Sequence, residues 1–171
     1  MVPQVYIAWS RLENITGHEM GRRLLAELHQ TYVGGEMPEI VIAPKGKPYF
    51  ADGRWHFSIS HTKRHAFCIL SDTPVGIDAE EMDRKVAPHI QQKILSPSEW
   101  AQVSKASVPD IAFLHIWVLK EATAKASGEG IRIHPSQTDF SLEDPRVRQI
   151  DGCLVAVVLQ NTDFQEEPYV I

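Results

Sequence analysis

The same order of secondary-structure patterns appears twice in this 171-residue sequence, once on either side of about residue 73. Each half combines a long helix-forming segment, Thr16–His29 or Ile111–Ser127, with several short extended segments. The extended segments are residues 5–9, 55–60 and 65–70 in the first half and 75–80, 138–142, 147–150 and 153–159 in the second. No repeat of the residues themselves accompanies this doubling. We therefore predict an α+β fold of two lobes, residues 1–73 and 74–171, each a small antiparallel sheet packed on helices.

Local signals fix several boundaries in the second half. Ser96 precedes Pro97 and Glu99, which together form the pattern of a capping box at a helix start. Asp110 is a good first residue for the long helix, and Gly128 is a good residue to end it. The pair at positions 151–152, Asp-Gly, predicts a tight hairpin turn.

Composition favours a cytoplasmic protein without a membrane span. No apolar run approaches the roughly 18 residues that suggest a spanning helix, and residues 1–4 lack the basic and then apolar pattern of a secretory signal. Cys68 and Cys153 give neither a disulfide framework nor a metal-ligand spacing, so we expect two reduced, buried thiols.

Charge is unevenly distributed along the chain. Residues 1–71 contain eight Lys and Arg against six Asp and Glu, a net of +2, whereas residues 72–171 contain nine against sixteen, a net of −7. A basic first half and an acidic second half fit a ligand that brings both phosphates and a cation. Nucleic acid fits less well, because no stripe of Lys and Arg with interleaved aromatic residues is present.

Asp78 and Glu80 are the first candidate site residues. They lie two positions apart on a predicted strand, so both carboxylates face the same side. Two like charges held close together are costly unless a cation or a proton lies between them. Mg²⁺ or Mn²⁺ suits such oxygen ligands. An isolated Asp-x-Glu is nevertheless more often the solvated face of an edge strand.

The long helix adds a second group. Trp117, Glu121 and Lys125 follow one another at intervals of four and form one stripe, with Lys120 beside Glu121. Glu121 can supply a third oxygen ligand or accept a proton, and Lys125 can reach a phosphate oxygen. Taken alone, Glu121 and Lys125 would be an ordinary surface ion pair, and Trp117 an ordinary core residue.

Two segments of the first half carry further candidates. Lys47 lies between Gly46 and Pro48 in a stiffened loop, where it can hold a phosphate as a point charge. Ser60 and His61 end a strand and can both donate to phosphate oxygens. His61 and His65 have an H-x-x-x-H spacing, but at a strand end rather than on a helix, which disfavours zinc.

In their order along the chain, these motifs resemble the 4′-phosphopantetheinyl transferases, specifically the larger Sfp-like group. The residues that carry the resemblance are Gly46-Lys47-Pro48, Ser60-His61, Gly76-Ile77-Asp78-Ala79-Glu80, Trp117-x-x-Lys120-Glu121-Ala122-x-x-Lys125 and Gly128-x-Gly130. The ordered set is far more specific than any one member. Position 118 is Val, where the family more often has a small hydroxyl or thiol residue.

The resemblance implies a monomeric pseudodimer of two similar lobes with coenzyme A between them. It also implies transfer of the phosphopantetheine arm of coenzyme A to a serine of an apo acyl, polyketide or peptidyl carrier protein, with release of 3′,5′-ADP. By similarity, the metal ligands would be Asp78, Glu80 and Glu121, and the coenzyme A contacts would be Arg22, Lys47, Ser60, His61 and Lys125. Glu121 would act as the base, and Lys120 would help to neutralise the leaving group.

Two other functions are compatible with parts of the pattern. A Mg²⁺-dependent nuclease or phosphohydrolase explains the carboxylates, but not the Lys47 loop or the Ser60-His61 pair. A non-catalytic module that binds carrier or coenzyme A has no need of three convergent acids.

Overall fold

The computed structural model describes residues 2–128 and 138–160. The helices and strands, in chain order, are β1 (Val5–Arg11), α1 (Gly17–Tyr32), β2 (Ile40–Ile42), β3 (Pro48–Phe50), β4 (His56–His61), β5 (His65–Ser71), β6 (Val75–Glu81), α2 (Pro88–Ile94), α3 (Pro97–Lys105), α4 (Pro109–Ser127), β7 (Val147–Ile150) and β8 (Cys153–Leu159).

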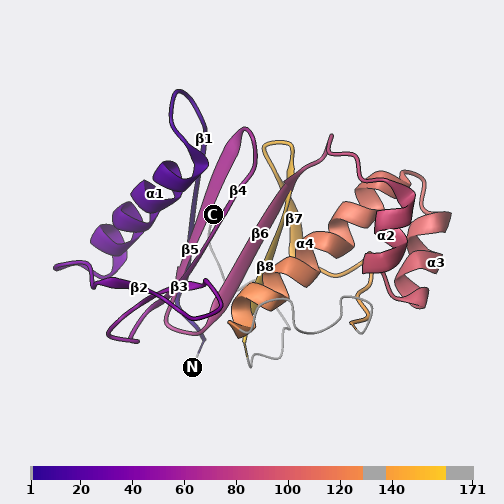
Figure 1. The fold of residues 1–171 in the computed structure, drawn as a ribbon. Helices are drawn as coiled ribbons and strands as arrows, with labels where there is room; N and C mark the ends of the chain where they lie inside the picture. The colour runs from indigo at the N-terminus through magenta and orange to yellow at the C-terminus, as the bar shows by residue number, and fades with distance from the viewer. Residues whose placement is uncertain (1, 129–137, 161–171) are drawn as a thin grey trace.

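Two three-stranded antiparallel sheets, one from each half of the chain, form the centre of the molecule. The first has the strand order β1-β5-β4 and the second the order β6-β8-β7, while β2 and β3 form a small separate hairpin. Helix α1 covers the outer face of the first sheet and α4 covers that of the second (Figure 1). The predicted α+β class, with small antiparallel sheets packed on helices, is thus confirmed.

Period-two alternation along the strands explains this layering. On β5, alternate residues such as Phe67 and Ile69 belong to the apolar cluster between the two sheets, and their neighbours such as Cys68 pack towards α1. On β6, Ile77 and Ala79 likewise face the first sheet. Since residues 76, 78 and 80 alternate with these, they face α4.

Gly76 allows α4 to lie directly on β6. A Cβ atom at this position would stand 2.0 Å from the carbonyl oxygen of Ala122, so only glycine fits without moving the helix. The face of α4 that carries Glu121 and Lys125 is therefore held against the acidic end of β6.

Hydroxyl groups join the two sheets where β4 meets β6. Ser58 Oγ accepts a hydrogen bond from the backbone N–H of Ile77 at 3.1 Å, and Ser60 Oγ accepts one from Ala79 N–H at 3.1 Å. Both serines are buried. They satisfy backbone donors of β6 that its neighbour in the second sheet leaves unpaired.

Most of the predicted boundaries are confirmed, but α4 begins at Pro109 after Val108, so Asp110 lies in its first turn and does not cap it. Ser96 and Glu99 form the expected capping box, and α4 ends before Gly128, which has a left-handed conformation. Asp151 and Gly152 have φ values of 48° and 80° and connect β7 to β8 in the expected hairpin.

The predicted extended segment at 138–142 is not a strand. Its backbone donates to side chains of α3 instead of to a neighbouring strand: Phe140 N–H to Glu99 Oε2 at 2.9 Å, and Leu142 N–H to Gln102 Oε1 at 3.2 Å. Gly130, part of one motif named above, lies outside the described residues.

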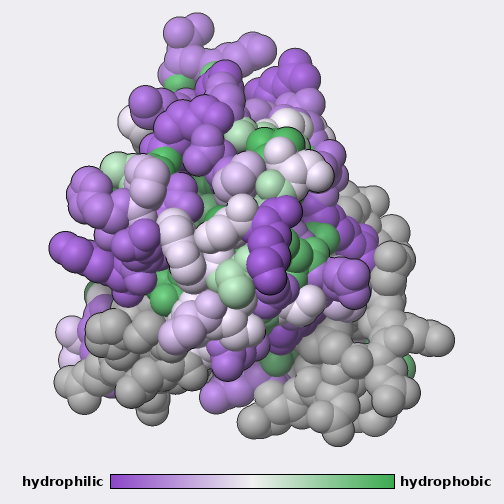
Figure 2. Space-filling view, turned by 90° about the vertical axis from the view of Figure 1, so that its right-hand side faces the viewer, coloured by the Kyte–Doolittle hydropathy of each residue, from purple (hydrophilic) through white to green (hydrophobic). Residues whose placement is uncertain are grey.

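None of the helices in residues 2–128 and 138–160 is long and apolar enough to cross a membrane. Figure 2 views the molecule from the side of α2 and α3. Hydrophilic residues predominate on this face, and hydrophobic residues appear between them in small groups. Cys68 and Cys153 are both free and buried, as predicted.

Candidate active site

Asp78 is a buried acid with one carboxylate oxygen that forms no hydrogen bond within the described residues. Its side chain is buried, and Oδ1 accepts from Lys125 Nζ at 2.9 Å and from Ser60 Oγ at 3.3 Å. The second oxygen, Oδ2, is buried without a hydrogen-bond partner among the described residues. Burial raises the pKa of this carboxyl group, although the charge of Lys125 opposes the change. A buried carboxylate oxygen left unsatisfied is costly, and it marks a position that a ligand can fill.

Glu121 faces Asp78 from α4. Burial, and after it the negative charge of Asp78, raise the pKa of Glu121 to about 6, and Glu80 adds to the effect. The three predicted metal ligands therefore act electrostatically on one another across the contact between β6 and α4. A carboxyl group with a pKa near 6 can change its protonation state close to neutral pH, as a general base does.

Glu80 turns towards other partners. Its Oε1 accepts from Trp117 Nε1 at 3.2 Å and pairs with the guanidinium group of Arg84. Among the described residues, the three potential metal ligands whose atoms lie within 4.8 Å of one another are His65, Glu81 and Cys153. The predicted ligands Asp78, Glu80 and Glu121 do not form such a group. The sequence analysis did not single out Arg84. The only signal that could have found it is its spacing of four residues from Glu80.

A pocket lies beside these acids, between the loop at residues 45–48 and α4. It has a volume of about 290 Å³, and Lys47, Glu121 and Lys125 are among the residues that line it. Lys47 Nζ donates to the carbonyl oxygens of Lys125 and Val75, the latter at 3.4 Å. Burial lowers the pKa of Lys47, and the charge of Lys125 lowers it further. Two ammonium groups are thus held together at one wall, where an anion would relieve their repulsion.

The structure places the remaining front-half candidates in different surroundings. Ser60 is buried and directs its hydroxyl to Asp78, so it contacts the acid rather than open solvent. His61 is exposed, and its ring lies so close to Gly17 at the start of α1 that a Cβ there would be 2.4 Å from it. His61 also lines a groove of about 920 Å³ together with Glu80.

Arg22 lies on α1, half-buried. Burial raises the pKa of the Cys68 thiol, and the charge of Arg22 opposes that rise, so the guanidinium lies near the first sheet.

Lys120 is not brought to the acidic cluster. Its Nζ forms a buried ion pair with Glu99 Oε1 at 2.8 Å and donates to the hydroxyl of Thr138 at 2.6 Å. Adjacent residues on a helix point in directions about 100° apart, so Lys120 faces α3 while Glu121 faces β6. In this structure Lys120 therefore connects α3, α4 and the segment around Thr138 and lies away from the acidic cluster, while its predicted role toward a leaving group stays a prediction. Val118, on α4 itself, is fully buried in the core, which fits a packing role.

Comparison with known proteins identifies the family of this chain. The family model of the 4′-phosphopantetheinyl transferase superfamily matches residues 74–167, more than half of the chain, and the chain belongs to this superfamily.

Three curated relatives illustrate the similarity. A 4′-phosphopantetheinyl transferase of Bacillus subtilis is 34% identical over 103 residues, which cover 58% of this chain and 45% of the relative. The transferase gsp of Aneurinibacillus migulanus is 37% identical over 93 residues, which cover 52% of this chain and 37% of the relative. The transferase Sfp of Bacillus subtilis (strain 168) is 29% identical over 143 residues (71% and 63%). The chain thus spans less than two thirds of the length of each.

Proposed function

We propose that this chain transfers the 4′-phosphopantetheine arm of coenzyme A to a serine of an apo acyl or peptidyl carrier protein and releases 3′,5′-ADP. The observation that carries the proposal is the buried carboxylate of Asp78. Its Oδ2 has no hydrogen-bond partner among the described residues, and its Oδ1 binds Lys125, which lines the Lys47 pocket together with Glu121. Membership of the superfamily supports the same reaction.

The carboxylates Asp78, Glu80 and Glu121 fit a hard divalent cation, Mg²⁺ or Mn²⁺. Asp78 Oδ2 has no hydrogen-bond partner among the described residues. Burial and, after it, the negative charge of Asp78 raise the pKa of Glu121, and a cation would neutralise that charge. When bound, such an ion supplies positive charge to the pyrophosphate oxygens. Glu80 would have to leave Arg84 to take part.

Binding of the pyrophosphate falls to the cations of the pocket. Lys47 and Lys125 lie at one wall, and each now donates to protein oxygens that phosphate oxygens can replace. Ser60, His61 and Arg22 are proposed as further coenzyme A contacts. Of these, Ser60 would act largely through Asp78, whose Oδ1 it already binds.

The chemical step is a displacement at the β-phosphorus of coenzyme A. The carrier serine oxygen forms a new bond to that phosphorus, and the bond to the bridging oxygen breaks, so that the 3′,5′-ADP leaves with the electron pair. Glu121 accepts the serine proton as its hydroxyl attacks. Lys47 and Lys125 lie where they can stabilise the charge that grows on the phosphate oxygens.

The same proposal extends to architecture and context. Each half contributes one three-stranded sheet and one long helix, which supports a pseudodimer of lobes 1–73 and 74–171 that acts as a monomer with coenzyme A between the lobes. The cytoplasm, where an intracellular carrier would be met, is the proposed location. Neither nucleic acid nor membrane is a proposed partner.

Incubation with coenzyme A, Mg²⁺ and an apo carrier tests the proposal directly. Mass spectrometry of the carrier should show the gain of one phosphopantetheine arm, and a carrier whose acceptor serine is replaced by Ala should show none. Hydrolysis of a nucleic acid or a simple phosphoester without any carrier modification would favour a nuclease or phosphohydrolase. Binding of carrier or coenzyme A without transfer would favour a non-catalytic module. A panel of apo carriers assayed side by side then identifies the preferred acceptor.

A further inference from the structure

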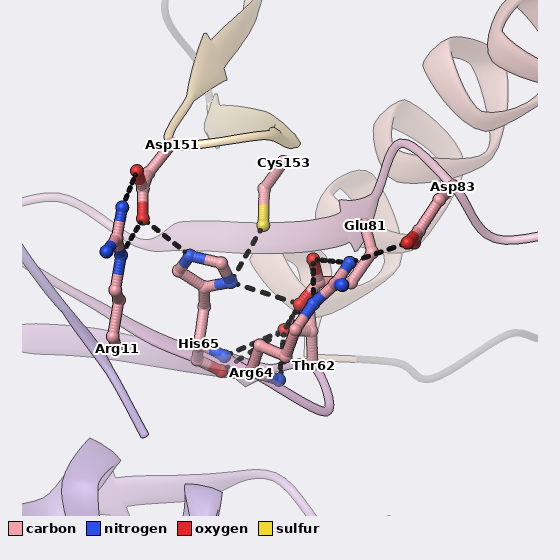
Figure 3. Close-up of polar contacts among 8 residues, drawn as sticks. All are labelled: Arg11, Thr62, Arg64, His65, Glu81, Asp83, Asp151 and Cys153. Carbon is pink, nitrogen blue, oxygen red and sulfur yellow. Dashed lines mark hydrogen bonds and ion pairs between the residues drawn. The ribbon is translucent and has the colours of Figure 1, made fainter. Parts of the chain in front are cut away.

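A second cluster of chemically reactive side chains lies on the opposite face of β6 from Asp78 and Glu80. His65 on β5, Glu81 on β6 and Cys153 on β8 come together between the two sheets, and all three are buried (Figure 3). We propose that these three side chains bind a structural Zn²⁺ ion, with a water molecule as the fourth ligand. This site is independent of the proposed transferase reaction.

The hydrogen-bonding arrangement of His65 requires a positive charge at its ring. Nδ1 lies 3.0 Å from Glu81 Oε1, and Nε2 lies 2.8 Å from Asp151 Oδ2. Ionised carboxylates only accept hydrogen bonds, whereas a neutral imidazole has a single N–H donor. One nitrogen of a neutral ring would therefore face a carboxylate without a proton. Either a second proton or a metal ion at Nδ1 resolves this conflict.

The position of Cys153 favours a metal ion over a second proton at Nδ1 of His65. Its Sγ lies 3.4 Å from the same Nδ1 atom that faces Glu81, so sulfur, nitrogen and oxygen atoms converge from three strands. Thiolate, imidazole and carboxylate are the ligands that Zn²⁺ takes in proteins, and its bond lengths place the ligand atoms of a tetrahedral site about 3.3–3.6 Å apart. The two separations from His65 Nδ1, 3.0 Å to Glu81 Oε1 and 3.4 Å to Cys153 Sγ, are within a few tenths of an ångström of these values, and all three ligand atoms lie within 4.8 Å of one another.

The surroundings resemble the outer shell of a metal site. With zinc on Nδ1, the Nε2–H of His65 donates to Asp151, which fixes the tautomer and the ring orientation. Arg64 binds Glu81 Oε2 through Nε at 3.1 Å and Nη2 at 2.8 Å, while Oε1, which faces His65, also accepts from the hydroxyl of Thr62 at 2.5 Å and from the backbone N–H of Arg64 at 3.3 Å. Arg11 binds both oxygens of Asp151, through Nε at 2.6 Å and Nη2 at 2.7 Å.

Charge and access also agree. Zn²⁺ with Arg11 and Arg64 would balance four anions, namely Glu81, Asp83, Asp151 and the thiolate of Cys153. A hollow of about 380 Å³ borders His65, Glu81 and Asp151, which gives the ion a route in and leaves room for a water ligand. In the metal-free protein, burial raises the pKa of the Cys153 thiol to about 12, and a bound cation would reverse that preference.

Metal analysis and cobalt substitution test the proposal. The purified chain should hold one zinc per molecule, and after chelation it should bind one Co²⁺ with the near-ultraviolet absorption of a cobalt–thiolate bond. Cys153→Ser, which preserves shape, should abolish that absorption and the stoichiometric zinc while the far-ultraviolet circular dichroism is unchanged. Cys68→Ala, the other buried thiol, should leave both signals intact.

The outer shell gives a graded measurement. Asp151→Asn should weaken zinc affinity about 10- to 100-fold, as changes to a histidine's carboxylate partner do. A chelated wild-type chain that binds no Co²⁺, or a Cys153→Ser variant that keeps the zinc, would overturn the proposed site. The ring of His65 would then be protonated and would donate to both Glu81 and Asp151. Neither result depends on whether the chain transfers phosphopantetheine.

Discussion

The two faces of β6 hold charged clusters of opposite character. On the face towards α4, burial raises the pKa of Asp78 and Glu121, so the ionised forms of both acids are disfavoured. On the face towards β5, burial alone would raise the pKa of Glu81, but hydrogen bonds from Arg64 and others lower it to about 2. The same strand therefore carries one poorly satisfied cluster and one well satisfied cluster.

This difference separates acids whose charge the native structure disfavours from an acid whose charge it stabilises. Acids whose ionised form is stabilised by the native structure contribute to folding, whereas acids whose ionised form is destabilised persist where a ligand compensates for them. The face towards α4 is accordingly the better candidate for chemistry. The opposite face links the two halves of the chain through His65 and Asp151.

The largest expected effect is the loss of transfer on the face towards α4. Asp78→Asn should reduce carrier modification by roughly 10²–10³-fold, because it removes charge from the proposed cation site at the reacting centre. Its thermal unfolding should change little, since the native structure disfavours the Asp78 charge. Asp110→Asn, at a half-buried acid on the same helix as Glu121 that pairs with Lys85 at 2.9 Å, is the control. Undiminished transfer by Asp78→Asn would remove this residue from the site.

Lys120→Met should show a loss of stability instead. Removal of one partner leaves Glu99 buried and uncompensated, at a cost of about 3 kcal/mol measured by urea unfolding. Adding Glu99→Gln should recover part of that loss, because Gln keeps a side-chain acceptor for the α3 cap without the charge. Transfer per folded molecule should fall far less than in Asp78→Asn. A loss as deep as in Asp78→Asn, with unchanged stability, would restore a catalytic role for Lys120.

Glu81→Gln should destabilise the metal-free protein by about 2 kcal/mol at pH 7, because it removes charged hydrogen bonds from Arg64. The folded-state pKa of Glu81, about 2, is below the ordinary value of 4.5, so its stabilisation is present above pH 4.5 and is lost as the pH falls towards 2. Denaturant unfolding between pH 2 and 7 should therefore show a smaller acid-dependent loss in the variant. Glu13→Gln, at an exposed position, is the control and should show the same pH dependence as the wild type. If Glu81→Gln also showed the wild-type pH dependence, the prediction would be contradicted.

The smallest expected effect is the pH dependence of transfer. In the metal-free protein the pKa of Glu121 is about 6, and a bound cation would lower it. Measured at Mg²⁺ concentrations well below saturation, where the metal-free pKa governs, kcat/KM should therefore fall about tenfold for each pH unit below 6 and level off above it. Glu143→Gln, an exposed acid, should leave this profile unchanged. A rate that stays constant down to pH 5 would show that Glu121 is not the base.

Much of the fold was predictable because local signals decide it. The capping box at Ser96, the left-handed residue Gly128 and the Asp151-Gly152 turn each act through neighbours within a few residues. The segment 138–142 was mispredicted as a strand, because hydrogen bonds from Phe140 and Leu142 to distant side chains replace a ladder.

The site was predictable only in part. Asp78 and Glu121 come together because strand and helix periodicity orient them, and both periods can be read from the sequence. The pairing of Glu80 with Arg84 depends on side-chain conformation at the end of β6. His65 and Cys153 are separated by 88 positions, so no spacing rule could bring them together.

Gly76 has a consequence for how this superfamily member can vary. A single added methyl group at Gly76 would lie 2.0 Å from the backbone of α4. The distance between Asp78 on the strand and Glu121 on the helix therefore depends on the absence of a side chain at this position. Larger residues there would push α4 outward and move Glu121 away from Asp78. The proposed cation site thus depends on a residue that has no side chain of its own.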